Sequence, residues 1–169
     1  LFNGQATVNV IQSCVPNIKN GWAVPAMDID TLLIAIRIAS YGHSMEFTTS
    51  CPKCQNVTDS AIDLRMALEG MRTPDYEKCL KYGDIEVYLR PMTYQNLNDN
   101  NRAQYNSQKL LANLPDSGLD EETQLATLSD TLKKITDVTV KALCLSIAAI
   151  KTPTAIVTEP EFIDEWLHN

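Results

Sequence analysis

The spacing of apolar residues between Asp28 and Gly42 predicts one helix that is apolar almost all round. Helices of this kind are typical of protein interiors, so we expect the helix over 28–41 to be buried. Asp28 is placed to cap its first turn and Gly42 to end it. Arg37 follows Asp30 by two turns on a similar face, which favours an ion pair between them. The aliphatic positions are Ile29, Leu32, Leu33, Ile34, Ile36 and Ile38.

Three further stretches carry helical patterns. The N-terminal segment predicts a helix that ends near Pro16, and a polar helix follows an N-cap at Thr93. A long helix is predicted from Asp120 to Ile150. Its first half repeats apolar residues at spacings of three and four, the pattern of a seam in a helical hairpin. These residues are Leu125, Leu128, Leu132 and Ile135.

Shorter stretches favour extended backbone. Residues 45–50 and 56–64 are two expected strands on either side of a turn with the sequence CPKC. Residues 76–92 predict a hairpin that turns at Tyr82-Gly83-Asp84. The predicted fold class is therefore α+β, mainly helical with a small antiparallel strand insert carrying a CPxC knuckle.

The predicted organisation has three parts. An N-terminal helical part (1–43) packs with a C-terminal helical part (92–169) as one core, and the strand and knuckle insert (44–91) lies between them in sequence. The chain begins with Leu1 rather than Met, so we expect a longer polypeptide whose start is missing.

Charge and hydropathy narrow the class of partner. The 169 residues include 14 basic and 21 acidic side chains, with a net charge of -7 and no cluster of Lys and Arg. Nucleic-acid binding is therefore disfavoured. No apolar run approaches the ~18 residues that a membrane span needs. A protein partner fits the composition better.

The cysteines supply the one pattern that resembles a binding site. Cys51 and Cys54 are spaced as half of a zinc site, but tetrahedral zinc needs four ligands. Cys79 is a candidate third ligand, and His43 or Asp59 a candidate fourth. A turn without metal and a disulfide are the alternatives. Cys14 and Cys144 lie in apolar stretches and are expected to be buried free thiols.

No constellation of catalytic residues is present. The sequence has two histidines and no nucleophile elbow or phosphate-binding glycine loop, so the prediction is a protein without enzyme activity. Aromatic and leucine residues instead suggest interfaces. The candidates are Trp22, Leu125, Leu128 and Leu132. The rival hypotheses are a zinc-dependent protein-binding module and a small enzyme with an unrecognised site.

The order of features resembles the baseplate hub proteins of contractile-tailed phages of the T-even (T-four-like) type. The matching stretches are IQSCVPNI, DIDTLLIAIRIASYG, CPKC, IDL, VYLRPMTYQNL, LSIAAI and FIDEWL. The resemblance covers most of the chain and resides in order and spacing.

This resemblance implies a structural or assembly (chaperone-like) protein of the tail baseplate, without enzyme activity. Its partners would be other hub or wedge proteins, and an oligomer is also expected. It would be assembled in the host cytoplasm and located in the virion tail. Asp30, Arg37, Cys51 and Cys54 would be family-typical positions with a role in folding, and Arg90-Pro91 would mark the exit from the strand insert. The resemblance implies no firm cofactor, and zinc stays a candidate.

Overall fold

The structure, a computed structural model, describes residues 3–115 and 117–168. The helical elements are α1 (Gln5–Cys14), the 3₁₀ turn η1 (Gly21–Ala23), α2 (Asp28–Tyr41), α3 (Leu64–Gly70), α4 (Tyr94–Asn113), α5 (Glu121–Ser146) and α6 (Pro160–His168). The strands are β1 (Ser44–Ser50), β2 (Val57–Asp63), β3 (Leu80–Tyr82), β4 (Ile85–Leu89), β5 (Ile147–Lys151) and β6 (Ile156–Val157). The predicted α+β class is confirmed.

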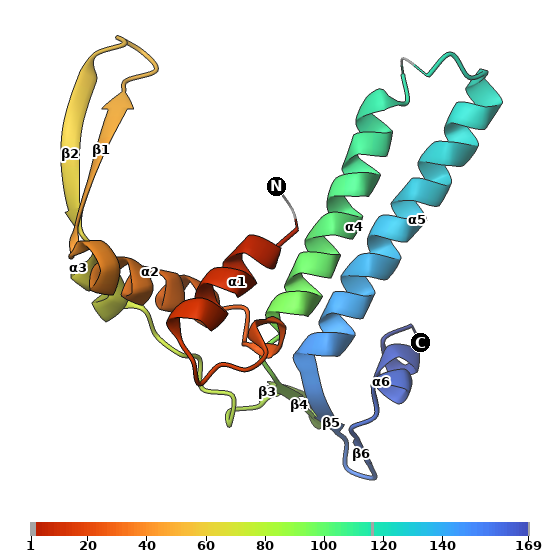
Figure 1. Ribbon diagram of the computed structural model, residues 1–169. Helices are drawn as coiled ribbons and strands as arrows, with labels where there is room; N and C mark the ends of the chain where they lie inside the picture. The colour runs from red at the N-terminus through yellow and green to blue at the C-terminus, as the bar shows by residue number, and fades with distance from the viewer. Residues whose placement is uncertain (1–2, 116, 169) are drawn as a thin grey trace.

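Two projections give the molecule its shape. The α4–α5 hairpin and the β1–β2 hairpin extend away from a base formed by α1, α2 and a small sheet (Figure 1). That sheet has the order β3-β4-β5-β6, and every neighbouring pair is antiparallel. β1 and β2 form a separate two-stranded sheet. Both predicted hairpins are therefore present, and Gly83 takes the positive φ of 59° that the β3–β4 turn requires.

The main core lies between the four-stranded sheet, the end of α5 and α6. Four residues in it are buried: Cys144, Ile147, Ile150 and Ile163. Residues of β4 and β6, together with Val140 and Leu167, pack around them. This apolar cluster fastens the long α5 helix and the C-terminal helix to the sheet.

The long helix ends earlier than predicted. The helix expected to reach Ile150 stops at Ser146, and residues 147–151 form the strand β5. Arg90 explains the position of this end, since its backbone N–H donates to the Ser146 carbonyl at 2.8 Å. Its guanidinium Nε also donates to the Leu145 carbonyl at 2.9 Å. Carbonyls of the last helical turn, which have no partner within the helix, are satisfied in this way.

A second apolar contact holds the N-terminal helices together. Val8 and Ile11 of α1 are buried, and Gly21 lies against them. A Cβ at Gly21 would come within 3.0 Å of Val8 Cγ1, so a larger residue would press the two elements apart. Backbone hydrogen bonds join this part to the start of α4: Ala26 N–H to the Met92 carbonyl and Tyr94 N–H to the Val24 carbonyl, both at 2.8 Å.

The prediction of a buried α2 is wrong. In α2 only Ile29 is buried, because α1 and α3 cover part of the helix and its other aliphatic residues stay half-exposed. The N-cap of α2 is Met27, one residue before the predicted Asp28, and it makes no side-chain capping hydrogen bond; the Asp28 N–H donates to the Pro25 carbonyl at 3.0 Å. The expected pairing of Arg37 with Asp30 is replaced by another contact. The Arg37 guanidinium donates to the Gly42 carbonyl at 3.1 Å and lies over the Tyr41 ring.

The molecule exposes far more surface than a compact protein of its size. Its accessible area is 12250 Å². A compact monomer of 18.8 kDa exposes about 8,300 Å². The difference of roughly 4,000 Å² is large compared with the ~800 Å² per partner of a standard interface. The two projections and the open face of α2 account for this open shape (Figure 1).

Candidate interaction surfaces

The predicted leucine seam does not face the other helix of the hairpin. Leu125, Leu128 and Leu132 are 60%, 37% and 50% exposed, so the prediction that they form the α4–α5 seam is wrong. Leu143, about three turns further along the same side of α5, is 53% exposed. We call these four residues the leucine stripe.

The contact between α4 and α5 is made by smaller and more polar residues. Thr131 is buried in it, and its hydroxyl donates to the Thr127 carbonyl one turn earlier. Near the base, a cavity of about 330 Å³ lies between Asn100 and Ala103 of α4 and Val138 of α5. Asn100 Oδ1 is buried there and makes no hydrogen bond to the described residues. The inner face of the hairpin thus combines small apolar residues with polar ones, while leucines line an outer face.

Most of the Trp22 side chain packs against other residues of this chain. Its ring stacks on Tyr94 with centroids 5.6 Å apart, and it lies directly beneath Gly4, where a Cβ would come within 2.8 Å of the ring. Trp22 therefore fixes the N-terminal part to α4 and leaves an edge at the surface. Trp166 of α6 is 40% exposed.

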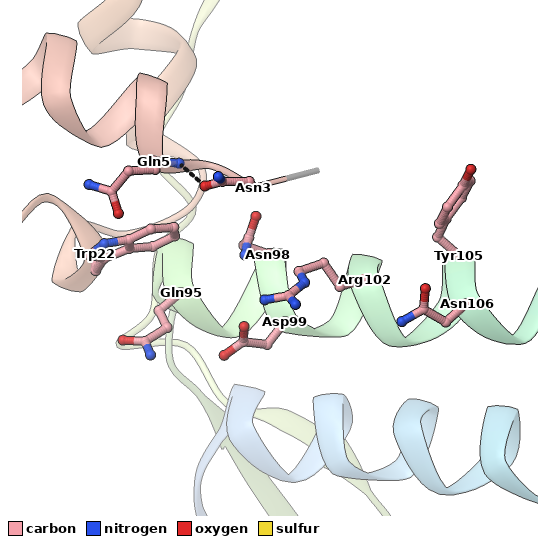
Figure 2. Close-up of a pocket in the computed structure, with 9 residues that line it drawn as sticks. All are labelled: Asn3, Gln5, Trp22, Gln95, Asn98, Asp99, Arg102, Tyr105 and Asn106. Atoms are coloured by element: carbon pink, nitrogen blue, oxygen red, sulfur yellow. Dashed lines mark hydrogen bonds between the residues drawn. The ribbon is translucent and has the colours of Figure 1, made fainter. Parts of the chain in front are cut away.

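The edge of Trp22 closes one end of an open cavity of about 610 Å³ along α4 (Figure 2). Asn98, Arg102 and Tyr105 line it from α4, and Gln5 lines it from α1. Amides predominate in this lining, with Asp99 and Arg102 as its charged groups. Among the carboxyl groups of the described residues, Asp63, Glu86 and Asp120 have lowered pKa values, and these three lie outside the cavity.

The lowered pKa of Glu86 is caused by its partners on neighbouring strands. Glu86 of β4 lies between lysines on the two neighbouring strands, with its oxygens 3.1 Å from Lys81 Nζ and 3.3 Å from Lys151 Nζ. Hydrogen bonds from Lys81, then Lys151, then the Tyr88 hydroxyl lower the pKa of Glu86. This cluster ties three strands together at the surface, so its role is structural.

The CPKC turn forms the tip of the β1–β2 hairpin. The Cys51 N–H donates to the Asn56 carbonyl at 2.9 Å, and the Gln55 N–H donates to the Cys51 carbonyl at 2.8 Å. Hydrogen bonds from the backbone N–H groups of Cys54 and Lys53, and from the Cys54 thiol, lower the pKa of Cys51. Cys51 and Cys54 are both exposed.

The other ligands considered from the sequence do not join this pair. The described residues contain no group of three or more His, Cys, Asp or Glu that could hold a metal. Cys79 precedes β3, at the opposite end of the molecule from the hairpin tip (Figure 1). His43 precedes β1 at the hairpin base, and Asp59 accepts a hydrogen bond from Thr48. Cys144 is buried as predicted, whereas Cys14 is exposed, contrary to the prediction.

A comparison with protein families identifies the class. The family model described as T4 bacteriophage base plate protein matches residues 3–155. The chain belongs to this family. No curated protein and no solved structure gave a match. Family membership makes the chain a structural component of the phage baseplate, located in the virion and interacting with other baseplate proteins.

Membership of the baseplate family offers an explanation for the large exposed surface of the molecule. A structural baseplate protein makes contacts with neighbouring proteins, and large exposed apolar residues are common at such contacts. In the described part of the chain, no helix is long and apolar enough to cross a membrane. The baseplate protein thus offers the leucine stripe and the β1–β2 hairpin as exposed candidate surfaces. Sequence analysis identified Leu125, Leu128 and Leu132 but missed Leu143. The signal available for Leu143 was its spacing, because three helical turns after Leu132 bring it back to the same side of α5.

Proposed function

We propose that this baseplate protein is a component of the baseplate hub, or an assembly (chaperone-like) factor of the hub, and that it binds neighbouring hub or wedge proteins through the leucine stripe. The exposure of three leucines at heptad spacing on α5 is the observation that carries this proposal. The resemblance to hub proteins supports the place in the baseplate. Five free cysteines accord with assembly in the reducing host cytoplasm.

The chemistry of the stripe favours a helix as the partner. Leu125, Leu128 and Leu132 follow the spacing with which coiled-coil helices receive each other's side chains. In the outer half of the hairpin, α4 is the one element of the described chain that lies beside α5 (Figure 1). An amphipathic helix of another baseplate protein would fit along this face and cover part of the roughly 4,000 Å² of excess surface.

The expected contribution of two of these leucines follows from their exposure. Leu128 and Leu132 are 37% and 50% exposed, which is close to one whole side chain in total. Burial of a Leu side chain is worth about 1.5–3 kcal/mol, so their removal should weaken binding by roughly 10- to 80-fold. Two buried carboxylates would weaken it further.

The test is co-expression with the other baseplate proteins of the same phage, followed by affinity capture. The variant Leu128→Glu/Leu132→Glu should lose a hub or wedge partner that the parent protein retains. Leu110→Glu is the matched control, because Leu110 is 47% exposed on α4 and lies outside the stripe. Unchanged capture by the double variant would contradict the proposal. Unfolding of the double variant, seen by circular dichroism, would instead show that the leucines belong to the core.

A further inference from the structure

The β1–β2 hairpin is an isolated element with an unusual tip. All seven residues of β1 are exposed, and β2 is exposed or half-exposed along its length. Two-stranded hairpins are at best marginally stable in water without further support. At the end farthest from the body, the chain places two cysteines in one turn (Figure 1).

The turn is shaped as half of a metal site. The Cys51 N–H donates to the Asn56 carbonyl at 2.9 Å, so Cys51 and Cys54, three residues apart, share one closed turn. Both cysteines are exposed at the tip. Gln55 adopts a φ of 56°, which few residues other than glycine take, and its N–H closes the turn onto the Cys51 carbonyl. Two cysteines separated by two residues in a tight turn are the usual contribution of one segment to a structural zinc site.

One chain cannot complete this site from its described residues. Tetrahedral zinc in a structural site takes four protein ligands. No third His, Cys, Asp or Glu of the described chain lies with the pair to form a metal-binding group. The hairpin is exposed along its length, so a second molecule can reach the tip from solvent.

We propose that Cys51 and Cys54 bind zinc together with the same two cysteines of a second copy of this chain, joining the two hairpins tip to tip. Four S–H bonds break and their protons pass to the solvent, while four S–Zn bonds replace the waters bound to the zinc ion, with no change of oxidation state. A two-fold axis through the metal would make the contact self-complementary. This inference does not depend on the hub assignment or on the leucine stripe.

The charge of the tip favours a second copy as the occupant. Lys53 is the one charged residue between Thr49 and Thr58. Two metal-free tips therefore carry like charges and repel each other. A zinc ion with four thiolates carries a net charge of −2, and the lysines of two tips would offset it. Association of this kind requires the metal.

The experiment uses the whole chain, purified under reducing conditions and supplied with zinc. Metal analysis should find about one zinc per two chains, and analytical ultracentrifugation should find a dimer that a chelator dissociates. With cobalt in place of zinc, the absorption spectrum should show tetrahedral coordination by four thiolates. The variant Cys51→Ser/Cys54→Ser should lose metal and dimer together, and Cys14→Ser/Cys79→Ser is the matched control that should keep both.

A second variant tests the charge argument without removing a ligand. Lys53→Glu should weaken the zinc-dependent dimer by roughly tenfold or more, because it adds negative charge beside the thiolates. Zinc bound to a monomer, no zinc bound, or a dimer that persists in chelator would each overturn the proposal. A dimer that forms without zinc and is dissociated by reductant would also overturn it, since it would be a disulfide.

Discussion

The Arg90 side chain contributes one of the two hydrogen bonds from Arg90 to the end of α5, and its removal should destabilise the fold measurably. Arg90→Ala removes the guanidinium hydrogen bond to the Leu145 carbonyl but keeps the backbone bond to Ser146. Hydrogen bonds that involve a charged group contribute about 1.5–3 kcal/mol. Because Arg90 is only half-buried, we expect a loss of about 1.5–2 kcal/mol in the free energy of unfolding. For a chain of this size, that loss lowers the melting temperature by about 3–8 °C.

Urea unfolding followed by circular dichroism measures this cost. Arg90→Lys retains the positive charge near the helix end without the fixed Nε donor, so it should recover part of the loss. Arg72→Ala, at an exposed arginine, is the control and should change stability by less than about 0.5 kcal/mol. If Arg90→Ala were as stable as this control, the carbonyl contact would not be what fixes the end of the helix.

Two further predictions follow from the core and from a surface ion pair. Ile150→Ala should lower the free energy of unfolding by about 2–5 kcal/mol, because Ile150 is fully buried, whereas Ile156→Ala at a 65% exposed site should cost less than about 0.5 kcal/mol in the same urea titration. The pKa of Asp63 is lowered to about 2 by hydrogen bonds from Arg65, so its contribution to stability is present above pH 4 and is lost as the pH falls towards 2. The stability difference between the parent and Asp63→Asn should therefore shrink between pH 5 and pH 3 in urea titrations, and a difference that grew on acidification would contradict this assignment.

Local signals in the sequence located most elements. The cap at Thr93 is confirmed, since its hydroxyl accepts the Asn96 N–H at 3.2 Å. The glycine turn at Gly83 and the two hairpins are also where the sequence places them. These features depend on residues a few positions apart, so a single sequence contains enough information to find them.

The errors come from contacts between distant residues. Ile147 and Ile150 are both buried although they are three apart, because Ala148 is an extra residue at a register shift opposite Tyr88 and Leu89. This bulge hides the alternation that would have indicated a strand. The leucine stripe follows a helical period equally well whether it faces α4 or a partner. Whether these leucines face solvent or another helix depends on how the whole chain packs, and the spacing of the leucines along α5 does not determine it.

The direct passage of α5 into β5 has a mechanical consequence. No loop separates Ser146 from Ile147, so the helix and the central strand form one continuous stiff segment. The 26 residues of α5 extend about 39 Å from the sheet. The buried cluster around Ile150 holds the other end of this segment in place. A neighbouring protein that displaced the far end of α5 would therefore transmit the displacement to the sheet.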